Sequence, residues 1–319
     1  MCIRVALLGL FLILQSPAYA QNFPIKTVTI VVPFGAGGSS DLMARALGQK
    51  LSEVWKQPVV IDNRPGGTTT IGTAHAARQP ADGYTILLAP PPFVIMPHVY
   101  SNLSYVALRD FRAVSLIAYY PLVTVVHPSL PVNNLKELIE YARSKPGTAY
   151  PSPGPGTSPH LISEYMAREE KLEFVHVPYR SGGQGINDLI GGRLAFYSGP
   201  TTEVLPHIRA GTVRPIAVLS EARTKQLPNV STSGEQGYGK YVATSWSTVV
   251  VPAKTPQSII DRISTDIATI IKDPGFRSKM EQQGAEFVGA APAAAQAFLI
   301  KEDNLWGPLV TASGIKPEN

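Results

Sequence analysis

Cysteine is almost absent from this sequence, since Cys2 is the only one in 319 residues. A cysteine at this position precedes the first apolar run, whereas the lipid-modified cysteine of a lipoprotein would follow it. If the leader is removed, the remaining chain contains no cysteine. Disulfides and a thiolate nucleophile are then both excluded, and stability must come from burial of a hydrophobic core.

The first twenty residues have the pattern of an export signal. Arg4 is followed by ten apolar residues at 5–14 and by the ending Ala-Tyr-Ala at 18–20. This order predicts a secretory signal peptide at 1–20, cleaved before Gln21. The apolar run is shorter than the roughly 20 residues that span a bilayer, which argues against a membrane anchor.

Charge is scarce as well, at 16% of residues, and it is nearly balanced. There are 28 Lys and Arg against 23 Asp and Glu, a net charge of +5, or +4 once Arg4 is removed with the leader. No run of basic residues is present, so nucleic-acid binding is not expected. With 44% hydrophobic residues the chain is globular.

Three families of catalytic or cofactor motif are missing. The phosphate loop G-x-x-x-x-G-K-[ST] does not occur, and G-x-G-x-x-G fails at Ser40, where the third glycine should stand. The hydrolase elbow G-x-S-x-G is also absent. We therefore expect no cofactor and no metal. The six histidines show no metal-binding spacing: His75, His98, His127, His160, His176 and His207.

From Thr27 onward, short apolar runs rich in β-branched residues alternate with helical patterns. Such runs suit parallel strands covered by helices on both faces, so an α/β fold with a mostly parallel sheet in each of two lobes is predicted. Two helical stripes are predicted. Met43, Leu47, Leu51 and Val54 fall on one face of the first helix, and Ile260, Ile263, Ile267 and Ile270 form a later stripe that is expected to face the core.

The order of these elements predicts the lobes. The first lobe would comprise 21–121 plus 250–319, and the second would comprise 122–249. Two crossings, near 119–126 and 246–252, would join them as a hinge.

Four glycine-bearing joints follow predicted strands, at 34–41, 63–72, 151–160 and 179–188. Ligands of open parallel sheets bind beyond the carboxyl ends of the strands, where these joints lie. Glycine allows close backbone approach, and the first turn of a helix offers unpaired N–H groups to an anion. Each joint alone could be an ordinary turn or helix cap, but four on one edge favour a ligand clamp.

Three side chains near these joints have two possible roles. Asp41 would either brace its own loop or contact an amine or hydroxyl of the ligand. Arg64 would clamp a carboxylate or cap loop carbonyls. His160 follows the PGPGTS loop and could be structural or a ligand contact.

The ordered motifs identify a family. The segments FPIKTVTIVVPFGAGGSSDLMARAL, QPVVIDNRPGGTTTIG, PADGYTILLA, YPSPGPGTSPHL, VPYRSGGQGINDLIGGRL and VRPIAVLSEARTKQLPNVSTSGEQGY resemble the Bug, or TctC-like, receptors of tripartite tricarboxylate transporters. The resemblance covers essentially the whole chain after the leader. It implies a two-lobed periplasmic binding protein, of Venus flytrap type, from a Gram-negative bacterium.

The same resemblance implies the site. The first two joints would hold one carboxylate through backbone amides and ordered water, and the second-lobe segments would shape the other end of the solute. The residues implied are Phe34, Gly35, Ala36, Gly37, Gly38, Ser39, Asp41, Gly66, Gly67, Thr68, Thr69, Gly154, Gly156, Thr157, His160, Tyr179, Gly182, Asp188, Ser198 and Gly199. The chain departs from the family pattern at Thr68, Thr69, Ser181 and Ser231.

The expected function is therefore a non-enzymatic receptor that closes on a small carboxylate. Its expected partners are membrane permease subunits or a sensor kinase, and the protein is expected to be a monomer. The alternative is a secreted α/β hydrolase or lyase in which Asp41 or His160 would be catalytic. The identity of the solute stays open.

Overall fold

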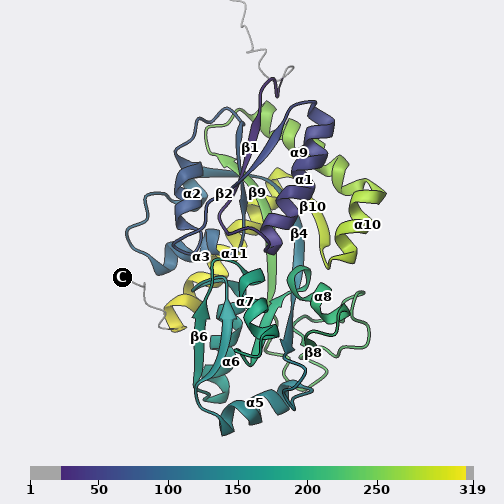
Figure 1. The fold of residues 1–319 in the computed structure, drawn as a ribbon. Helices are drawn as coiled ribbons and strands as arrows, with labels where there is room; N and C mark the ends of the chain where they lie inside the picture. The colour runs from purple at the N-terminus through teal and green to yellow at the C-terminus, as the bar shows by residue number, and fades with distance from the viewer. Residues whose placement is uncertain (1–22, 314–319) are drawn as a thin grey trace, which may run out of the picture.

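The computed structural model describes residues 23–313, and the predicted signal peptide lies outside them. Two lobes lie one above the other in Figure 1. The first lobe contains β1 (Val28–Val32), α1 (Ser39–Trp55), β2 (Val59–Asn63), α2 (Thr70–Ala77), β3 (Thr85–Ala89), α3 (Pro92–Val99), α4 (Ala107–Asp110), β9 (Thr244–Pro252), α9 (Gln257–Lys272), α10 (Pro274–Gln282), β10 (Glu286–Ala290) and α11 (Pro292–Ser313).

The second lobe is built from the middle of the chain. It contains α5 (Leu135–Ser144), β5 (Thr148–Ser152), α6 (Ser158–Glu170), β6 (Phe174–Pro178), α7 (Gly182–Ile190), β7 (Phe196–Pro200), α8 (Thr201–Arg209) and β8 (Arg214–Val218). The long strand β4 (Phe111–Val126) belongs to both lobes.

The sheet of the first lobe is mixed. Its order is β10-β4-β9-β3-β1-β2, and β1 pairs in parallel with β2 and β3. By contrast, β9 runs antiparallel to β3 and β4, and β10 runs antiparallel to β4. The prediction of a mostly parallel sheet is wrong for this half. Parallel neighbours require a crossover connection, whereas β4 leaves the lobe and β9 re-enters it in the opposite direction.

The second lobe shows the same mixture. The last residues of β4, 122–126, pair antiparallel with β7 and β8, while β5 and β6 pair in parallel. Residues 111–121 of the same strand pair with β9. One continuous strand thus carries the hydrogen-bonded sheet from lobe to lobe, and β9 runs beside it.

Helices cover both faces of the first sheet, as predicted. On one face, Met43, Leu47 and Leu51 of α1 are fully buried against β1 and α9. The predicted stripe of α9 is buried in the same cluster, which confirms it. Val54, predicted on the same face as these residues, is 44% exposed, and the neighbouring Trp55 is buried instead. On the other face, α3 and α11 pack against the sheet.

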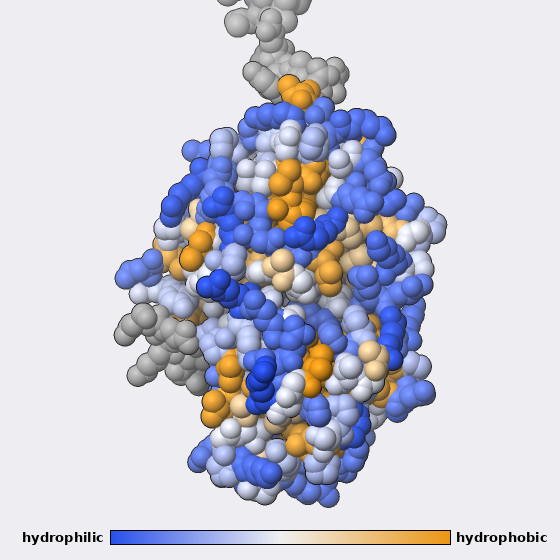
Figure 2. Space-filling view, in the orientation of Figure 1, coloured by the Kyte–Doolittle hydropathy of each residue, from blue (hydrophilic) through white to orange (hydrophobic). Residues whose placement is uncertain are grey.

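The face of the molecule shown in Figure 2 is mainly hydrophilic, and its hydrophobic residues form separate patches. This distribution is ordinary for a globular surface. Within the described part of the chain, no helix combines the length and hydrophobicity that crossing a membrane requires.

Candidate functional site

The four glycine-bearing joints meet in pairs across the lobes. The N–H of Gly35 donates to the carbonyl of Arg180 at 3.1 Å, so the joint after β1 contacts the joint after β6. A Cβ on Gly183 would lie 2.9 Å from the carbonyl oxygen of Gly37. A Cβ on Gly154 would lie 2.9 Å from Oγ1 of Thr68, which joins the other two loops. Glycine is therefore required here by close backbone approach.

A small cavity of about 30 Å³ lies between the lobes beside these loops. By that measure it has room for roughly two water molecules. It is too small for an organic solute, so the lobes are closed on each other. The cavity is lined by Phe34, Gly38, Ser39, Ser40, Pro90, Pro91, Pro92, Pro153, Thr157, Ser158, Pro159, Ser181, Gly182, Pro200, Glu203 and Ser245.

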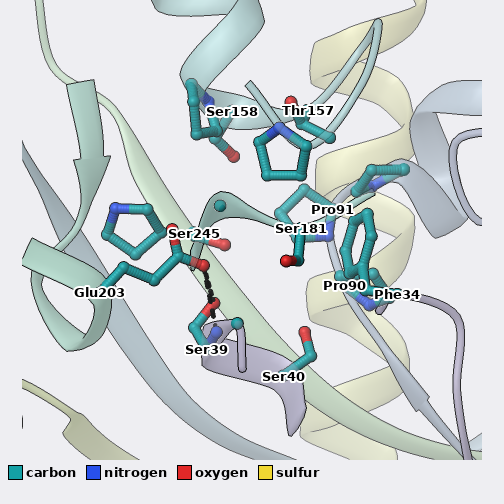
Figure 3. A pocket seen from close by; sticks show the side chains of 16 residues that line it. Phe34, Ser39, Ser40, Pro90, Pro91, Thr157, Ser158, Ser181, Glu203 and Ser245 are labelled. Atoms are coloured by element: carbon teal, nitrogen blue, oxygen red, sulfur yellow. Dashed lines mark hydrogen bonds between the residues drawn. The ribbon is translucent and has the colours of Figure 1, made fainter. Parts of the chain in front are cut away.

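The helices α1, α6, α7 and α8 all begin at or next to residues that line this cavity. Each brings unpaired N–H groups and the positive end of its dipole. The serine hydroxyls drawn in Figure 3 surround the same space, and Phe34 and the prolines form an apolar wall. The site is therefore attractive to an anionic group that is attached to an apolar body.

Glu203 is the one side chain with a formal charge among the described residues that line the cavity. It stands in the first turn of α8 and reaches across to α1 (Figure 3). Its Oε1 accepts hydrogen bonds from the backbone N–H of Ser39 at 3.1 Å and from the Ser39 hydroxyl at 3.3 Å. Its Oε2 accepts one from the Tyr197 hydroxyl at 2.7 Å.

Burial raises the pKa of Glu203, and the hydrogen bonds from Tyr197 and Ser39 offset only part of that effect. The side chain is fixed from the second lobe as well, because a methyl group on Gly182 would overlap its Oε2. Sequence analysis missed this residue. The only signal was an acidic residue in the first turn after a strand, and that position alone does not show which way the side chain points.

Five of the predicted contacts line the cavity: Phe34, Gly38, Ser39, Thr157 and Gly182. The others do not line it. Sequence analysis also missed the three prolines 90–92, which follow β3 at the same edge of the sheet. This joint contains no glycine, the residue that marks the four predicted joints.

Asp41 braces its own loop. Its carboxylate accepts the N–H of Gly37 at 3.0 Å, Nε of Arg45 at 2.9 Å and Nδ2 of Asn63 at 3.0 Å. Burial opposes its ionisation, but these bonds outweigh that effect and lower the pKa of Asp41. These bonds agree with the structural role among the two that the sequence left open. Nε of Arg64 donates to Asp62 beside it at 2.6 Å, a contact that the sequence did not predict.

His160 lies behind the PGPGTS loop. Its Nδ1 accepts the N–H of Gly156 at 3.1 Å, and its ring is 4.4 Å from that of His176, between centroids. Burial, followed by the neighbouring His176, lowers the pKa of His160 to about 3. Burial lowers the pKa of His176 to about 4. Both imidazoles are neutral at physiological pH, and His160 holds the loop in place.

Two other predicted residues form a separate cluster. The Tyr179 hydroxyl donates to Oδ2 of Asp188 at 2.6 Å, and Arg193 bonds to the other oxygen at 2.6 Å. In the buried interior, Ser198 bonds to Thr124 at 3.0 Å, and the neighbouring Gly199 packs against the ring of Tyr197. These residues support the second lobe.

The loop after β2 contains strained threonines. Thr68 has φ of 44° and Thr69 has φ of 80°, in a region that β-branched residues rarely adopt. Gly66 and Gly67 precede them with positive φ as well. Thr68 meets Gly154 of the opposite lobe, so the departure from the family pattern falls at an interlobe contact.

No cluster of three or more histidine, cysteine, aspartate or glutamate side chains that could hold a metal occurs in residues 23–313. The donors at the cavity are backbone amides and hydroxyls, which suit a bound solute and not a transition metal.

Comparison with known proteins agrees with this geometry. The profile of the tripartite tricarboxylate transporter family receptor matches residues 43–315. Protein BugT of Bordetella pertussis is 33% identical over 318 residues, covering 98% of each chain. The periplasmic binding protein BugD has a similar structure, with a TM-score of 0.89 and 30% identity. It is matched over its whole length by 93% of this chain.

The structure of R. palustris Rpa4515 with adipate is also similar, with a TM-score of 0.89, 33% identity and the same coverage. The family predicted from the ordered motifs is thus confirmed, as is the two-lobed α/β fold of periplasmic binding proteins. These relatives are solute-binding proteins and not enzymes. The chain belongs to the receptor family of the tripartite tricarboxylate transporters.

Proposed function

We propose that this protein is a periplasmic receptor that captures a small carboxylated solute between its lobes and presents it to a membrane partner. One observation carries the proposal: the start of α1 already holds a carboxylate, that of Glu203, on the N–H and hydroxyl of Ser39. An amide and a hydroxyl at a helix N-terminus are suitable donors for a solute carboxylate. The adipate bound to Rpa4515, which is 33% identical, supports the same class of solute.

Capture requires the lobes to part. A cavity of about 30 Å³ admits no organic acid, so the solute enters an open form and is enclosed when the lobes close again. The strands β4 and β9 connect the two lobes and would act as the hinge. In this proposal the lobes are 21–121 plus 250–319 and 122–249, with their boundaries inside β4 and near the end of β9. The solute shifts the equilibrium by binding the closed form better than the open form.

The signal peptide is removed before Gln21, and the receptor is a monomer in the periplasm. The closed form is recognised by permease subunits or by a sensor kinase.

Binding is tested on the purified mature chain. Denatured protein is first analysed by mass spectrometry for a retained solute. Thermal unfolding is then followed with adipate and a panel of mono-, di- and tricarboxylates. A ligand at 100 times its dissociation constant adds about 2.7 kcal/mol of stability, which gives a clear rise in melting temperature.

The matched control for adipate is adipamide, which has the same chain length without carboxylates. It should leave the melting temperature unchanged. A panel without any stabilising carboxylate would contradict the proposal, and so would conversion of a bound carboxylate into product.

A further inference from the structure

Glu203 presents a problem for a receptor of carboxylates, and this inference rests on the function proposed above. A solute carboxylate bound at the start of α1 would need the donors that Glu203 already uses. Glu203 is 7% exposed and points into the cavity from α8. Its carboxylate is thus a built-in competitor for the place of the solute.

Contacts from three elements fix the position of the Glu203 carboxylate. The Tyr197 hydroxyl binds Oε2 at 2.7 Å, Ser39 binds Oε1 through two donors, and Gly182 leaves the space that Oε2 fills. Beside it, the Ser181 hydroxyl is buried, and no hydrogen-bond partner for it exists within residues 23–313. A bound group at this point would satisfy that hydroxyl.

The groups around Glu203 cannot neutralise a second carboxylate. From β7 it faces the hydroxyl of Tyr197, from α1 it faces Ser39, and from α7 it faces Gly182. Those groups are uncharged, and no lysine, arginine or histidine is found among the described residues that line the cavity. One turn further along α8, His207 has a pKa lowered by burial and adds no positive charge at neutral pH.

We propose that Glu203 is the specificity-determining residue of the cleft. A solute carboxylate displaces it from Ser39 and binds together with one proton, which Glu203 takes from solvent and shares with the solute. Two carboxylates that share one site cannot both be ionised, so one of them must carry a proton. The burial that raises the pKa of Glu203 favours the same protonation.

Proton-linked binding has a defined pH dependence. Between the pKa of Glu203 in the free protein and its higher pKa in the complex, each bound solute takes up one proton. The dissociation constant therefore rises by up to tenfold for each pH unit in that window. Below the pKa of Glu203 in the free protein, no proton is taken up on binding, and the affinity no longer changes with pH through this residue.

The experiment is isothermal titration of the mature chain with adipate between pH 5 and pH 8, in buffers of different ionisation enthalpy. The wild-type protein should take up close to one proton per adipate, a measurement that needs no variant. Glu203→Gln keeps the shape and an acceptor for Ser39 but removes the charge. It should bind adipate at least tenfold more tightly at pH 8 and without proton uptake.

Glu164→Gln is the matched control, because Oε1 of Glu164 also accepts from a tyrosine hydroxyl, that of Tyr150 at 2.5 Å. It does not line the cavity, so its proton uptake should equal that of the wild type. Binding of adipate to the wild type without proton uptake would overturn the inference and leave the proposed function intact. Weaker binding by Glu203→Gln would also overturn it, since Glu203 would then be a direct ligand contact.

Two further outcomes separate the proposals. If adipate binds Glu203→Gln but not the wild type, Glu203 acts as the competitor that we infer. If adipate binds neither protein at any pH, the proposed function fails for this solute class, and the inference fails with it.

Discussion

Gly37 lies in the joint after β1 with a left-handed backbone conformation. Its φ is +87°, and a Cβ built there would meet no atom within 4 Å. A side chain at this position is therefore opposed by backbone conformation and not by crowding. The N–H of Gly37 also binds Asp41, so the conformation of the loop and the position of Ser39 are connected.

We predict that Gly37→Ala lowers the free energy of unfolding by about 1–2 kcal/mol and also weakens solute binding. Gly211→Ala is the control, because Gly211 has φ of +69° and equally open surroundings away from the cavity. It should lose similar stability and keep its affinity. Urea unfolding measures the stability and calorimetric titration measures the affinity. If Gly37→Ala lost no more affinity than Gly211→Ala, the loop would be an ordinary turn.

The two contacting imidazoles are a second residue-scale feature. The pKa values of His160 and His176 are lowered to about 3 and about 4, against 6.5 for an ordinary histidine. Between pH 6.5 and about 4, the unfolded chain binds protons that the folded chain does not. These two imidazoles therefore cause no loss of stability above pH 6.5. As the pH falls below 6.5, each lowers the free energy of unfolding by about 1.4 kcal/mol per pH unit.

The pH effect is measured by urea unfolding at pH 7 and pH 5. In His176→Gln, the difference in the free energy of unfolding between the two pH values should shrink by about 2 kcal/mol relative to the wild type. An unchanged difference would mean that His176 is not held neutral in the folded protein.

At the scale of elements, α8 connects the lobes at two places. Glu203 reaches α1, and the Thr201 hydroxyl donates to the carbonyl of Gly284, between α10 and β10, at 2.7 Å. On the same side, Arg209 binds the carbonyl of Gln282 at 2.8 Å. These contacts between α8 and the first lobe therefore depend on the lobes being closed.

We predict that Thr201→Val removes one interlobe hydrogen bond and destabilises the closed form by about 1 kcal/mol. Solute affinity should fall several-fold as a result. Thr255→Val is the control, since Thr255 is also buried and donates to a carbonyl, that of Pro252 at 2.8 Å, within one lobe. It should cost similar stability without loss of affinity. Equal affinities in both variants would contradict a role for this contact in closure.

For the whole molecule, closure is the property that matters. The glycine joints touch in pairs and leave a cavity of about 30 Å³, so the structure is that of the closed form. The tie between Glu203 and Ser39 is one cause of that closure.

We predict that the radius of gyration of the mature chain, measured by X-ray scattering, decreases when adipate is added. Glu203→Ala should have a larger radius than the wild type in the absence of solute, because it lacks the tie. Adipate should return it to the compact value. An identical radius for both proteins, with and without adipate, would show that the lobes do not open in solution.

The sequence alone predicted the family, the α/β class, the two lobes and three of the joints that line the cavity, whereas the joint at 63–72 does not line it. These features follow from local patterns: hydrophobic periodicity defines the elements, and strand ends of one sheet meet at one edge. It also predicted both possible roles of Asp41. It missed α3, because a helix with Pro92 and Pro97 within its bounds lacks the usual pattern and is stabilised by burial.

Only the tertiary structure decided which residues meet. The antiparallel course of β4 and β9 depends on the chain leaving one lobe and returning, which no local pattern records. The bond between Glu203 and Ser39 joins residues 164 positions apart. The direction of one buried side chain depends on the packing of both lobes. The sequence therefore indicated where a carboxylate would bind, and the packing of the lobes showed that this place already contains one.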